Sequence, residues 1–490
     1  MPSGVFDSTL LKHLWSTEEL RAIFNDANRV QKWYDYEAAL ALAQAELGIV
    51  PQAAAAEIAR KAKVGNVDLE AIAAEVRRIK HPLVPALRAL QAICDGDHGE
   101  YLHFGPTTQD VLDTGVMLQI KDAHAVFTRD LQDIGRELFR LAERHKDTPM
   151  AGRTHAVQAL PITFGHKCAI WLAETGRNYE RLTQLQDRTF VGSLVGAVGS
   201  KASFGERAFE LDQRVMARLG LGVADISWQP ARDRLVEYVG VLGLIGGSLA
   251  KVANEIMNLA HTEIDELAEP FNEGKVGSST MPHKRNPATV EAVVAVGRTL
   301  RYTVALMHEA LMQEHERDAS LWRLEWKALP EACLMTGVIL AQMKDVLAGL
   351  EVHADKMRRN LDALGGFLLS ERVMFALADK IGKQTATRWS MRRRCRASSR
   401  ASPSSVPCRR ARAPSRPLQA TSCRRCSTRP PISALLQPSS RAFSTRPAHP
   451  AGSMASDRRV RPKVPGCSMT LMGSVRMWRK RLTLRPVVRR

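Results

Sequence analysis

The sequence predicts an all-α protein built around a bundle of long helices. Three observations predict this class. Aromatic residues make up only 6% of the 490-residue chain, while Ala and Leu are abundant, a composition that favours packed helices. Apolar residues recur every three or four positions over long stretches, as on a helix with one buried face. Alternating apolar and polar residues, the pattern of a half-buried strand, are scarce.

Three periodic stretches mark the long helices. The first opens at Pro161, a residue suited to the first turn of a helix, and continues to residue 182. The second runs through residues 239–259, and no proline interrupts residues 236–268. The third follows Pro287 and continues to about Glu316. At about 1.5 Å per residue, each of the last two would be about 45 Å long, a length typical of a helical bundle.

The regions beside the bundle differ from it. Shorter helices, broken at Pro51, Pro82 and Pro85, come before it, and the pair Gly365-Gly366 breaks the helical pattern after it. We therefore expect an N-terminal helical domain, a central long-helix bundle and the start of a C-terminal helical domain, at residues 1–110, 111–360 and 361–386.

Residues 387–490 have a different character, because they are rich in Arg, Ser, Pro and Ala and have no helical period. They hold 26 of the 70 Lys and Arg but only one of the 51 Asp and Glu, so residues 1–386 carry 44 basic and 50 acidic side chains. Two interpretations stay open for this tail, a disordered basic segment or the product of a shifted reading frame. Nucleic-acid binding is expected at most as nonspecific binding by the tail.

The body of the chain indicates a cytoplasmic protein. Cys94, Cys168 and Cys333 are widely spaced within apolar helical patterns, as expected of reduced thiols in a cytosolic protein. There is no run of about 18 apolar residues, so no membrane span is expected. No secretory signal is expected either, because the first residues lack a basic region followed by an apolar core.

One short segment carries most of the chemistry. Residues 277–287 read Gly-Ser-Ser-Thr-Met-Pro-His-Lys-Arg-Asn-Pro and precede a predicted helix. Free backbone N–H groups at a helix N-terminus attract anions. Lys284 adds a positive charge and Asn286 adds an amide donor. The segment therefore suits a substrate that carries a carboxylate.

This segment resembles the signature of the fumarase/aspartase (fumarate lyase) superfamily. Two further segments resemble superfamily regions in the expected order, Phe-Gly-Pro-Thr-Thr-Gln-Asp at residues 104–110 and Gly-Arg-Thr-His at residues 152–155. The resemblance extends over about residues 10–386. It implies a homotetramer whose active sites are each assembled from three subunits and act on a small dicarboxylate.

The resemblance also implies roles for individual residues. Ser278 would be the general base, and Lys284 and Asn286 would hold the negative charge that develops on the substrate carboxylate. His155 would serve as or orient the general acid, with Glu291 as its partner. The expected catalytic residues are thus Ser278, His155, Glu291 and His81, and the expected substrate-binding residues are Thr107, Thr108, His103, Thr154, Lys284, Asn286 and Arg317.

No cofactor or metal is expected. His308 and His315 lie two helical turns apart, about 10 Å, which is too far for one ion without further ligands. The chain also has neither a zinc motif nor a glycine loop that could cradle a phosphate.

The branch of the family is harder to predict. Adenylosuccinate lyases have a Ser and an Arg for the nucleotide phosphate after a His-Glu-Arg-Asp segment, whereas this chain has Trp322 and Trp326 there. The stretch around these residues resembles 3-carboxy-cis,cis-muconate cycloisomerases, but His155 stands where those typically carry Trp. We favour a lyase that breaks a C–N or C–O bond of a substituted succinate and releases fumarate or a related acid. The alternatives are a cycloisomerase, then an adenylosuccinate lyase, and outside catalysis a structural or nucleic-acid-binding helical protein.

Overall fold

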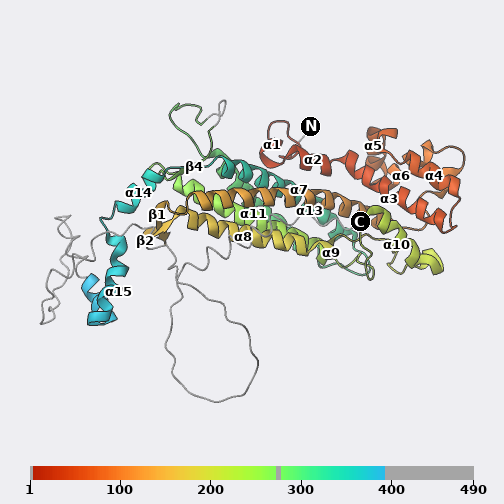
Figure 1. The fold of residues 1–490 in the computed structure, drawn as a ribbon. Helices are drawn as coiled ribbons and strands as arrows, with labels where there is room; N and C mark the ends of the chain where they lie inside the picture. Colours follow the sequence, from red (N-terminus) through yellow and green to blue (C-terminus); the bar gives the residue numbers. More distant parts are fainter. Residues whose placement is uncertain (1–3, 272–276, 392–490) are drawn as a thin grey trace, which may run out of the picture. The chain divides into compact units, whose positions relative to one another are not determined.

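The fold, described here from a computed structural model that covers residues 4–271 and 277–391, is all-α as predicted (Figure 1). The chain forms two compact units. Unit 1 comprises Met1–Glu137, Glu174–Asn258 and Ala268–Glu351, and unit 2 comprises Leu138–Ala173, Leu259–Leu267 and Val352–Arg490. Both units are built from segments that are discontinuous in sequence, so the domain borders drawn along the chain at residues 110, 360 and 386 stay a prediction.

Short helices open unit 1, and polar or proline residues fix where they begin. Thr17 accepts a hydrogen bond from the N–H of Leu20, and Asp68 accepts from two N–H groups at the start of α5, which satisfies donors that a helix start leaves free. Pro51 and Pro82 directly precede helices. The elements are α1 (Lys12–Trp15), α2 (Glu18–Phe24), α3 (Asp26–Glu46), α4 (Gln52–Lys61), η1 (Val64–Asn66), α5 (Leu69–Ile79), α6 (Leu83–Ile93) and η2 (His98–Tyr101).

Pro85 does not break a helix, contrary to the prediction. It lies in the first turn of α6, where the N–H that proline lacks would have no partner within the helix.

The long helices form the bundle in unit 1, and α7, α11 and α13 lie side by side in it (Figure 1). The predicted apolar stripe of α11 is buried throughout, from Val239 to Leu259. Glycines bring the helices close, since a Cβ on Gly246 would meet Leu300 of α12 at 2.5 Å. The helical elements of this part of the chain are α7 (Thr108–Arg144), α8 (Phe164–Gln184), α9 (Gln186–Thr189), η3 (Ala202–Arg207), α10 (Ala208–Leu219), α11 (Asp233–Leu259), α12 (Ala288–Glu309) and α13 (Ala319–Ala348). Residues 138–144 of α7 and 164–173 of α8 belong to unit 2.

Helix α11 is also long and apolar enough to cross a membrane, although no membrane span was expected. Of its most apolar window, however, 56% is buried inside the protein. A core helix of a bundle has this composition, so α11 is weak evidence for a membrane span.

Two predicted helix borders were wrong. The helix expected to open at Pro161 begins at Phe164, because Pro161 pairs with Ala151 in a hairpin of β1 (Pro149–Thr154) and β2 (Val157–Thr163). The helix expected to reach Glu316 ends at Glu309. Beyond it Leu311 and Met312 are exposed, so no buried apolar face continues the helix.

Unit 2 contains the hairpin and the helices at the end of the described chain. Gly365 and Gly366 both have positive φ, which confirms that the pair breaks the helical pattern. The last elements are β3 (Leu267–Ala268), which pairs with β4 (Glu351–Val352), and α14 (Ala354–Asp362), η4 (Phe367–Leu369) and α15 (Ser370–Ile381).

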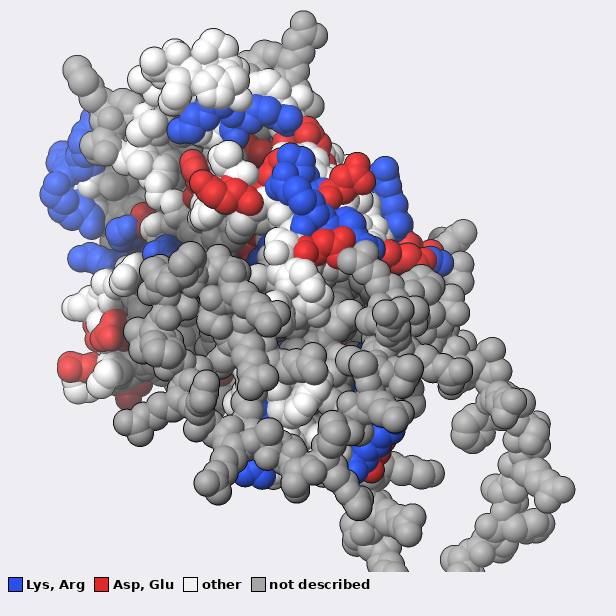
Figure 2. All heavy atoms as spheres, turned by 90° about the vertical axis from the view of Figure 1, so that its left-hand side faces the viewer, with Lys and Arg blue, Asp and Glu red and all other residues white. Residues whose placement is uncertain are grey.

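Residues 383–391 are again helical, so helix continues five residues into the predicted tail. The remainder of the tail, residues 392–490, lies outside the described residues, and its predicted lack of structure stays a prediction. Among the described side chains in Figure 2, charges of both signs lie next to one another.

Candidate active site

Four of the predicted site residues form a cluster in unit 1. An N–H of Arg317, Nη1, donates to Oγ1 of Thr107 at 2.8 Å. Oγ1 of Thr108, the first residue of α7, lies 3.3 Å from Nε2 of His81. The structure therefore brings together residues from three distant segments of the chain. They offer hydroxyl, imidazole and guanidinium donors, which is the donor set that a carboxylate needs.

His81 has a defined tautomer in this cluster. The backbone N–H of Val84 donates to Nδ1 of His81 at 3.1 Å, so in the neutral ring the proton lies on Nε2, which faces Thr108. Burial and the nearby charge of His103 lower the pKa of His81. His81 is therefore a neutral hydrogen-bond donor near pH 7, and its expected catalytic role stays a prediction.

The pKa of His103 is raised, whereas that of His81 is lowered. Burial disfavours its charged form, but the hydrogen bond from Nδ1 to Glu37, at 2.7 Å, and the charges of Glu37 and Asp110 outweigh burial and raise the pKa of His103. The carboxylate of Glu37 is fully buried. The pair therefore keeps a positive charge on His103, close enough to His81 to lower the pKa of His81.

Asp110 fixes the turn that carries the two threonines. Its carboxylate accepts hydrogen bonds from the N–H of Thr107 at 3.0 Å and from the N–H of Gly196 at 2.9 Å. It also accepts from the hydroxyl of Ser193 at 2.7 Å and the N–H of Val195 at 3.1 Å. Asp110 is not among the predicted site residues, although an acid within the first turn of a long helix indicates such a role.

The signature segment forms a compact loop before α12. Its backbone passes very close to itself, since a Cβ on Gly277 would lie 2.4 Å from the carbonyl oxygen of Lys284. The half-buried Ser278 accepts hydrogen bonds at Oγ from the N–H groups of Met281, at 3.1 Å, and Thr280, at 3.4 Å. Two donors thus point at the oxygen that would have to act as base. Lys284 is exposed beside this turn, and Asn286 is half-buried.

The N-terminus of α12 is not an open anion site, contrary to the prediction. The carboxylate of Glu269 accepts hydrogen bonds from the N–H groups of Thr289, at 3.1 Å, and Val290, at 3.2 Å. This carboxylate takes the place that a substrate anion would need. Lys284 and Asn286 remain available on this loop, and their expected role in substrate binding stays a prediction.

A second contact holds the base of the loop. The guanidinium of Arg285 forms two hydrogen bonds with Glu351, at 2.6 and 3.2 Å, and one with the carbonyl of Glu269 at 3.3 Å. It also lies 4.8 Å from the ring centre of Phe271, in the position of a cation–π contact. Arg285 thus anchors the C-terminal part of the signature segment.

Thr154 and His155 lie in unit 2, exposed at the end of the β1–β2 hairpin. His155 and Ala156 form its two-residue turn, and both have positive φ, at 51° and 64°, as in the turns that tight hairpins favour. The strand is anchored by Arg153, which forms an ion pair with the fully buried Glu266 at 2.7 Å. Glu291 is exposed in the first turn of α12 in unit 1, and its pairing with His155 stays a prediction.

The two donor groups of unit 1 are not brought together within one chain. Ser278, Lys284 and Asn286 precede α12, whereas Arg317, which contacts Thr107, follows it. Helix α12 has 22 residues, so at about 1.5 Å per residue its ends lie about 33 Å apart. No small substrate can touch both groups of the same chain.

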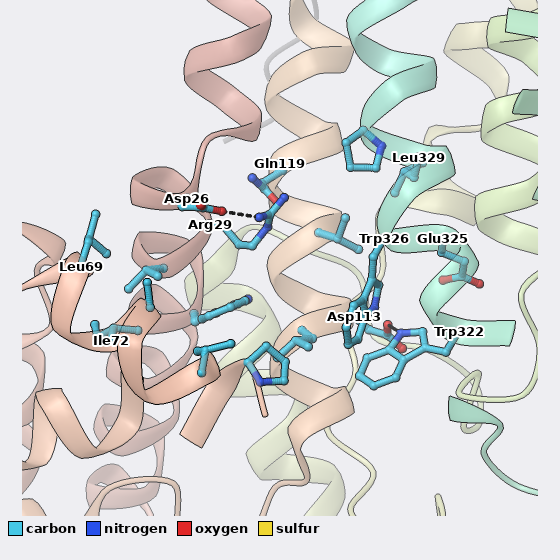
Figure 3. Close-up of a pocket in the computed structure, with 18 of the residues that line it drawn as sticks. Asp26, Arg29, Leu69, Ile72, Asp113, Gln119, Trp322, Glu325, Trp326 and Leu329 are labelled. Atoms are coloured by element: carbon cyan, nitrogen blue, oxygen red, sulfur yellow. Dashed lines mark hydrogen bonds and ion pairs between the residues drawn. The ribbon is translucent and has the colours of Figure 1, made fainter. Parts of the chain in front are cut away.

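The two tryptophans that argued against a nucleotide differ in their surroundings. Trp322 is buried, and its Nε1–H donates to Asp113 at 2.9 Å. Asp113 and Glu325 both form ion pairs with the fully buried Arg232. Trp326 remains 40% exposed. Trp322 is thus part of a buried polar network (Figure 3), whereas the ring of Trp326 is partly exposed. Over the described residues, no three His, Cys, Asp or Glu side chains gather as metal ligands.

Comparison with known proteins gives consistent matches. The family model described as "Lyase" matches residues 15–300. An N-acetyl-S-(2-succino)cysteine lyase of Enterococcus italicus is 50% identical over 386 residues, 79% of this chain and 85% of that protein. An adenylosuccinate lyase of Pyrococcus abyssi is 42% identical over 77% of this chain and 84% of that protein. The crystal structure of a 3-carboxy-cis,cis-muconate lactonizing enzyme from Pseudomonas putida superposes with a TM-score of 0.76 at 36% identity, covering 80% of this chain and 88% of that one.

Proposed function

The chain belongs to the fumarate lyase superfamily and is an enzyme of that family, and from this premise we propose that it releases fumarate and a thiol from an S-substituted succinate. The observation that carries the reaction type is the Ser278 oxygen, at which two backbone N–H groups point. The S-linked substrate is favoured by the names of two relatives, 50% and 47% identical, that are N-acetyl-S-(2-succino)cysteine lyases. A C–S bond therefore replaces the C–N or C–O bond expected from sequence.

The proposed reaction is a β-elimination. Ser278 takes a proton from the methylene carbon beside one carboxylate, and the electron pair left on that carbon is delocalised into this carboxylate. Lys284 and Asn286 stabilise the charge that develops there. The electron pair then forms the double bond of fumarate while the C–S bond breaks and the thiolate leaves. Donation from the N–H groups of Thr280 and Met281 makes the serine alkoxide a less costly species.

A thiol leaving group requires less proton donation from His155 than an amine would. A thiol has an ordinary pKa of about 8.5, so a thiolate departs without full protonation in the transition state. An amine must be protonated to leave. We propose that His155 supplies the proton after or during departure.

The site is proposed to form between subunits. The Thr107, Thr108, His81 and Arg317 cluster and the Ser278 loop lie at opposite ends of α12 in one chain, so a complete site requires donors from different chains. Apolar side chains on the bundle are available for such contacts, since Leu244 of α11 is 52% exposed and Tyr302 of α12 is 80% exposed. We propose the homotetramer expected from the family, located in the cytoplasm.

A direct test uses the purified full-length chain with three substrates in parallel. These are N-acetyl-S-(2-succino)cysteine, adenylosuccinate and 3-carboxy-cis,cis-muconate. Fumarate by absorbance and free thiol by a colorimetric reagent should appear in equal amounts from the first compound. Lactone formation from carboxymuconate, without fumarate from the other two, would replace the proposal by the cycloisomerase, which the 0.76 TM-score to a lactonizing enzyme keeps as the second candidate.

A further inference from the structure

One buried carboxylate lies at the base of the loop formed by residues 277–287, here called the signature loop. Glu269 precedes this loop and is only 6% exposed, whereas Thr289 and Val290 follow it. Oε1 of Glu269 accepts a hydrogen bond from the hydroxyl of Thr289 at 3.2 Å. Oε2 accepts from the N–H groups of Thr289, at 3.1 Å, and Val290, at 3.2 Å. A single side chain therefore joins two points of the chain that are 20 residues apart.

Both of the joined points are held by packing. Val290 and Val293 of α12 are fully buried, so the first turn of this helix cannot shift without disturbing the core. On the other side, Pro270 packs against the end of α13, since a Cβ on Gly349 would lie 2.7 Å from the Cβ of Pro270. Glu269 thus connects the segment before the signature loop to a rigid helix.

The residues proposed to act in proton abstraction lie between these two points. They are Ser278, Lys284 and Asn286. The signature loop also closes on itself, because the N–H of Asn286 donates to the carbonyl oxygen of Gly277 at 3.3 Å. This contact sets spacing within the loop but not the place of the loop on the bundle. Place matters, because a misplacement of about 1 Å at a reacting centre can cost about 100-fold in rate.

The geometry gives Glu269 no direct part in substrate binding. Its two oxygens already accept from Thr289 and Val290. A negative charge that faced a substrate carboxylate would also oppose binding, whereas a negative charge at the start of a helix is stabilised there. Glu269 can therefore affect the reaction only through the position of the loop.

We propose that Glu269 is a positioning residue, which holds the signature loop where Ser278 reaches the methylene proton of the substrate. The proposal rests on the proposed function, because it takes Ser278 as the base. It deepens that function by assigning the placement of the base to a side chain outside the signature loop. The informative variant is Glu269→Gln, which keeps the side-chain volume but replaces one oxygen by an NH₂ group that cannot accept from an N–H.

The test measures fumarate release by the purified full-length chain from N-acetyl-S-(2-succino)cysteine, with and without deuterium on the succinyl methylene. In Glu269→Gln, kcat per folded enzyme should fall about tenfold, while KM changes less than about threefold. The deuterium effect on kcat should rise above that of the parent, because proton abstraction by a misplaced base limits turnover. A simple loss of folded enzyme would leave the isotope effect unchanged.

Asp130→Asn is the matched control. Asp130 is likewise buried and ion-paired, with Lys344 at 2.8 Å, but it lies on α7, outside residues 269–290. Its variant should lose stability and keep both the kcat per folded enzyme and the isotope effect. Thr289→Val guards against misfolding of Glu269→Gln, since it removes only the hydroxyl donor. Loss of that one hydrogen bond should lower kcat about threefold and raise the isotope effect.

The outcomes separate the positioning role from the proposed function when Ser278→Ala is measured alongside. Parent kcat in both Glu269→Gln and Thr289→Val, with a slow Ser278→Ala, would overturn the positioning role and leave the proposed function standing. A lowered kcat with an unchanged isotope effect would mean that Glu269 only supports the fold, and would overturn it too. Parent activity in Ser278→Ala would overturn the proposed function itself.

Discussion

Arg317 and Thr107, 210 residues apart in sequence, are joined by a 2.8 Å hydrogen bond from the guanidinium to the hydroxyl. This bond uses one of the five N–H groups of the guanidinium, and the others can still donate hydrogen bonds to a carboxylate. The contact thus links the start of α7 to the turn before α13 and holds the two side chains next to each other.

Removing this guanidinium should weaken substrate binding. In Arg317→Ala a charged hydrogen bond to the substrate, worth about 1.5–3 kcal/mol, is lost, so KM should rise about 10- to 100-fold while kcat changes less. Steady-state fumarate release gives both values. Arg301→Ala is the control, because Arg301 is exposed on α12 and has no ion pair in the described part of the chain. An unchanged KM in Arg317→Ala would exclude a binding role.

The His103–Glu37 pair should make stability depend on pH. Burial lowers the pKa of His103, but Glu37 outweighs it and raises this pKa above its ordinary value, which is about 6.5. The folded protein therefore holds the proton more tightly than the unfolded chain does. This stabilisation is fully present below about pH 6.5 and is lost as the pH rises through the raised pKa.

Urea unfolding at pH 6 and pH 9 tests whether the stabilisation by the His103–Glu37 pair decreases as the pH rises. Glu37→Gln should lower the free energy of unfolding at pH 6 by about 1.5–3 kcal/mol and lower it less at pH 9. Glu263→Gln, at an exposed position, serves as the control. A larger loss at pH 9 than at pH 6 would contradict the assignment.

The buried network around Arg232 should be a large contributor to stability. Arg232 is fully buried between Asp113 and Glu325, so Arg232→Met leaves two buried acids without their counter-charge and should cost about 3–5 kcal/mol of unfolding free energy. The triple variant with Asp113→Asn and Glu325→Gln should recover part of this loss. A loss under about 1 kcal/mol in Arg232→Met would show that water reaches the acids.

The contact between Arg285 and Glu351 should position the loop that carries Ser278, the proposed base. Arg285→Glu should lower kcat about tenfold, since small misplacement of a catalytic group is costly, and the exchange Arg285→Glu with Glu351→Arg should restore much of it. Lys327→Ala breaks a comparable surface pair with Glu331 on α13 and should leave kcat unchanged. If the exchange variant is as slow as the single variant, the ion pair does not position the loop.

The sequence predicted those features that depend on local pattern. The apolar stripe of α11 and the glycine break at residues 365–366 are such features. It failed where a distant partner decides the outcome, because Pro161 joins a strand opposite Ala151 instead of opening a helix. Likewise the motifs identified Thr107 and Arg317 separately, but no periodicity could show that they touch.

The paired variants Ser278→Ala and Ser279→Ala test the central claim most directly, because the two serines are neighbours and only the Ser278 oxygen accepts from the N–H groups of Thr280 and Met281. Fumarate release from N-acetyl-S-(2-succino)cysteine is measured for both. Loss of a general base should lower kcat of Ser278→Ala by about 10²- to 10⁴-fold, while Ser279→Ala stays close to the parent. A Ser278→Ala variant that keeps the parent rate would contradict the account.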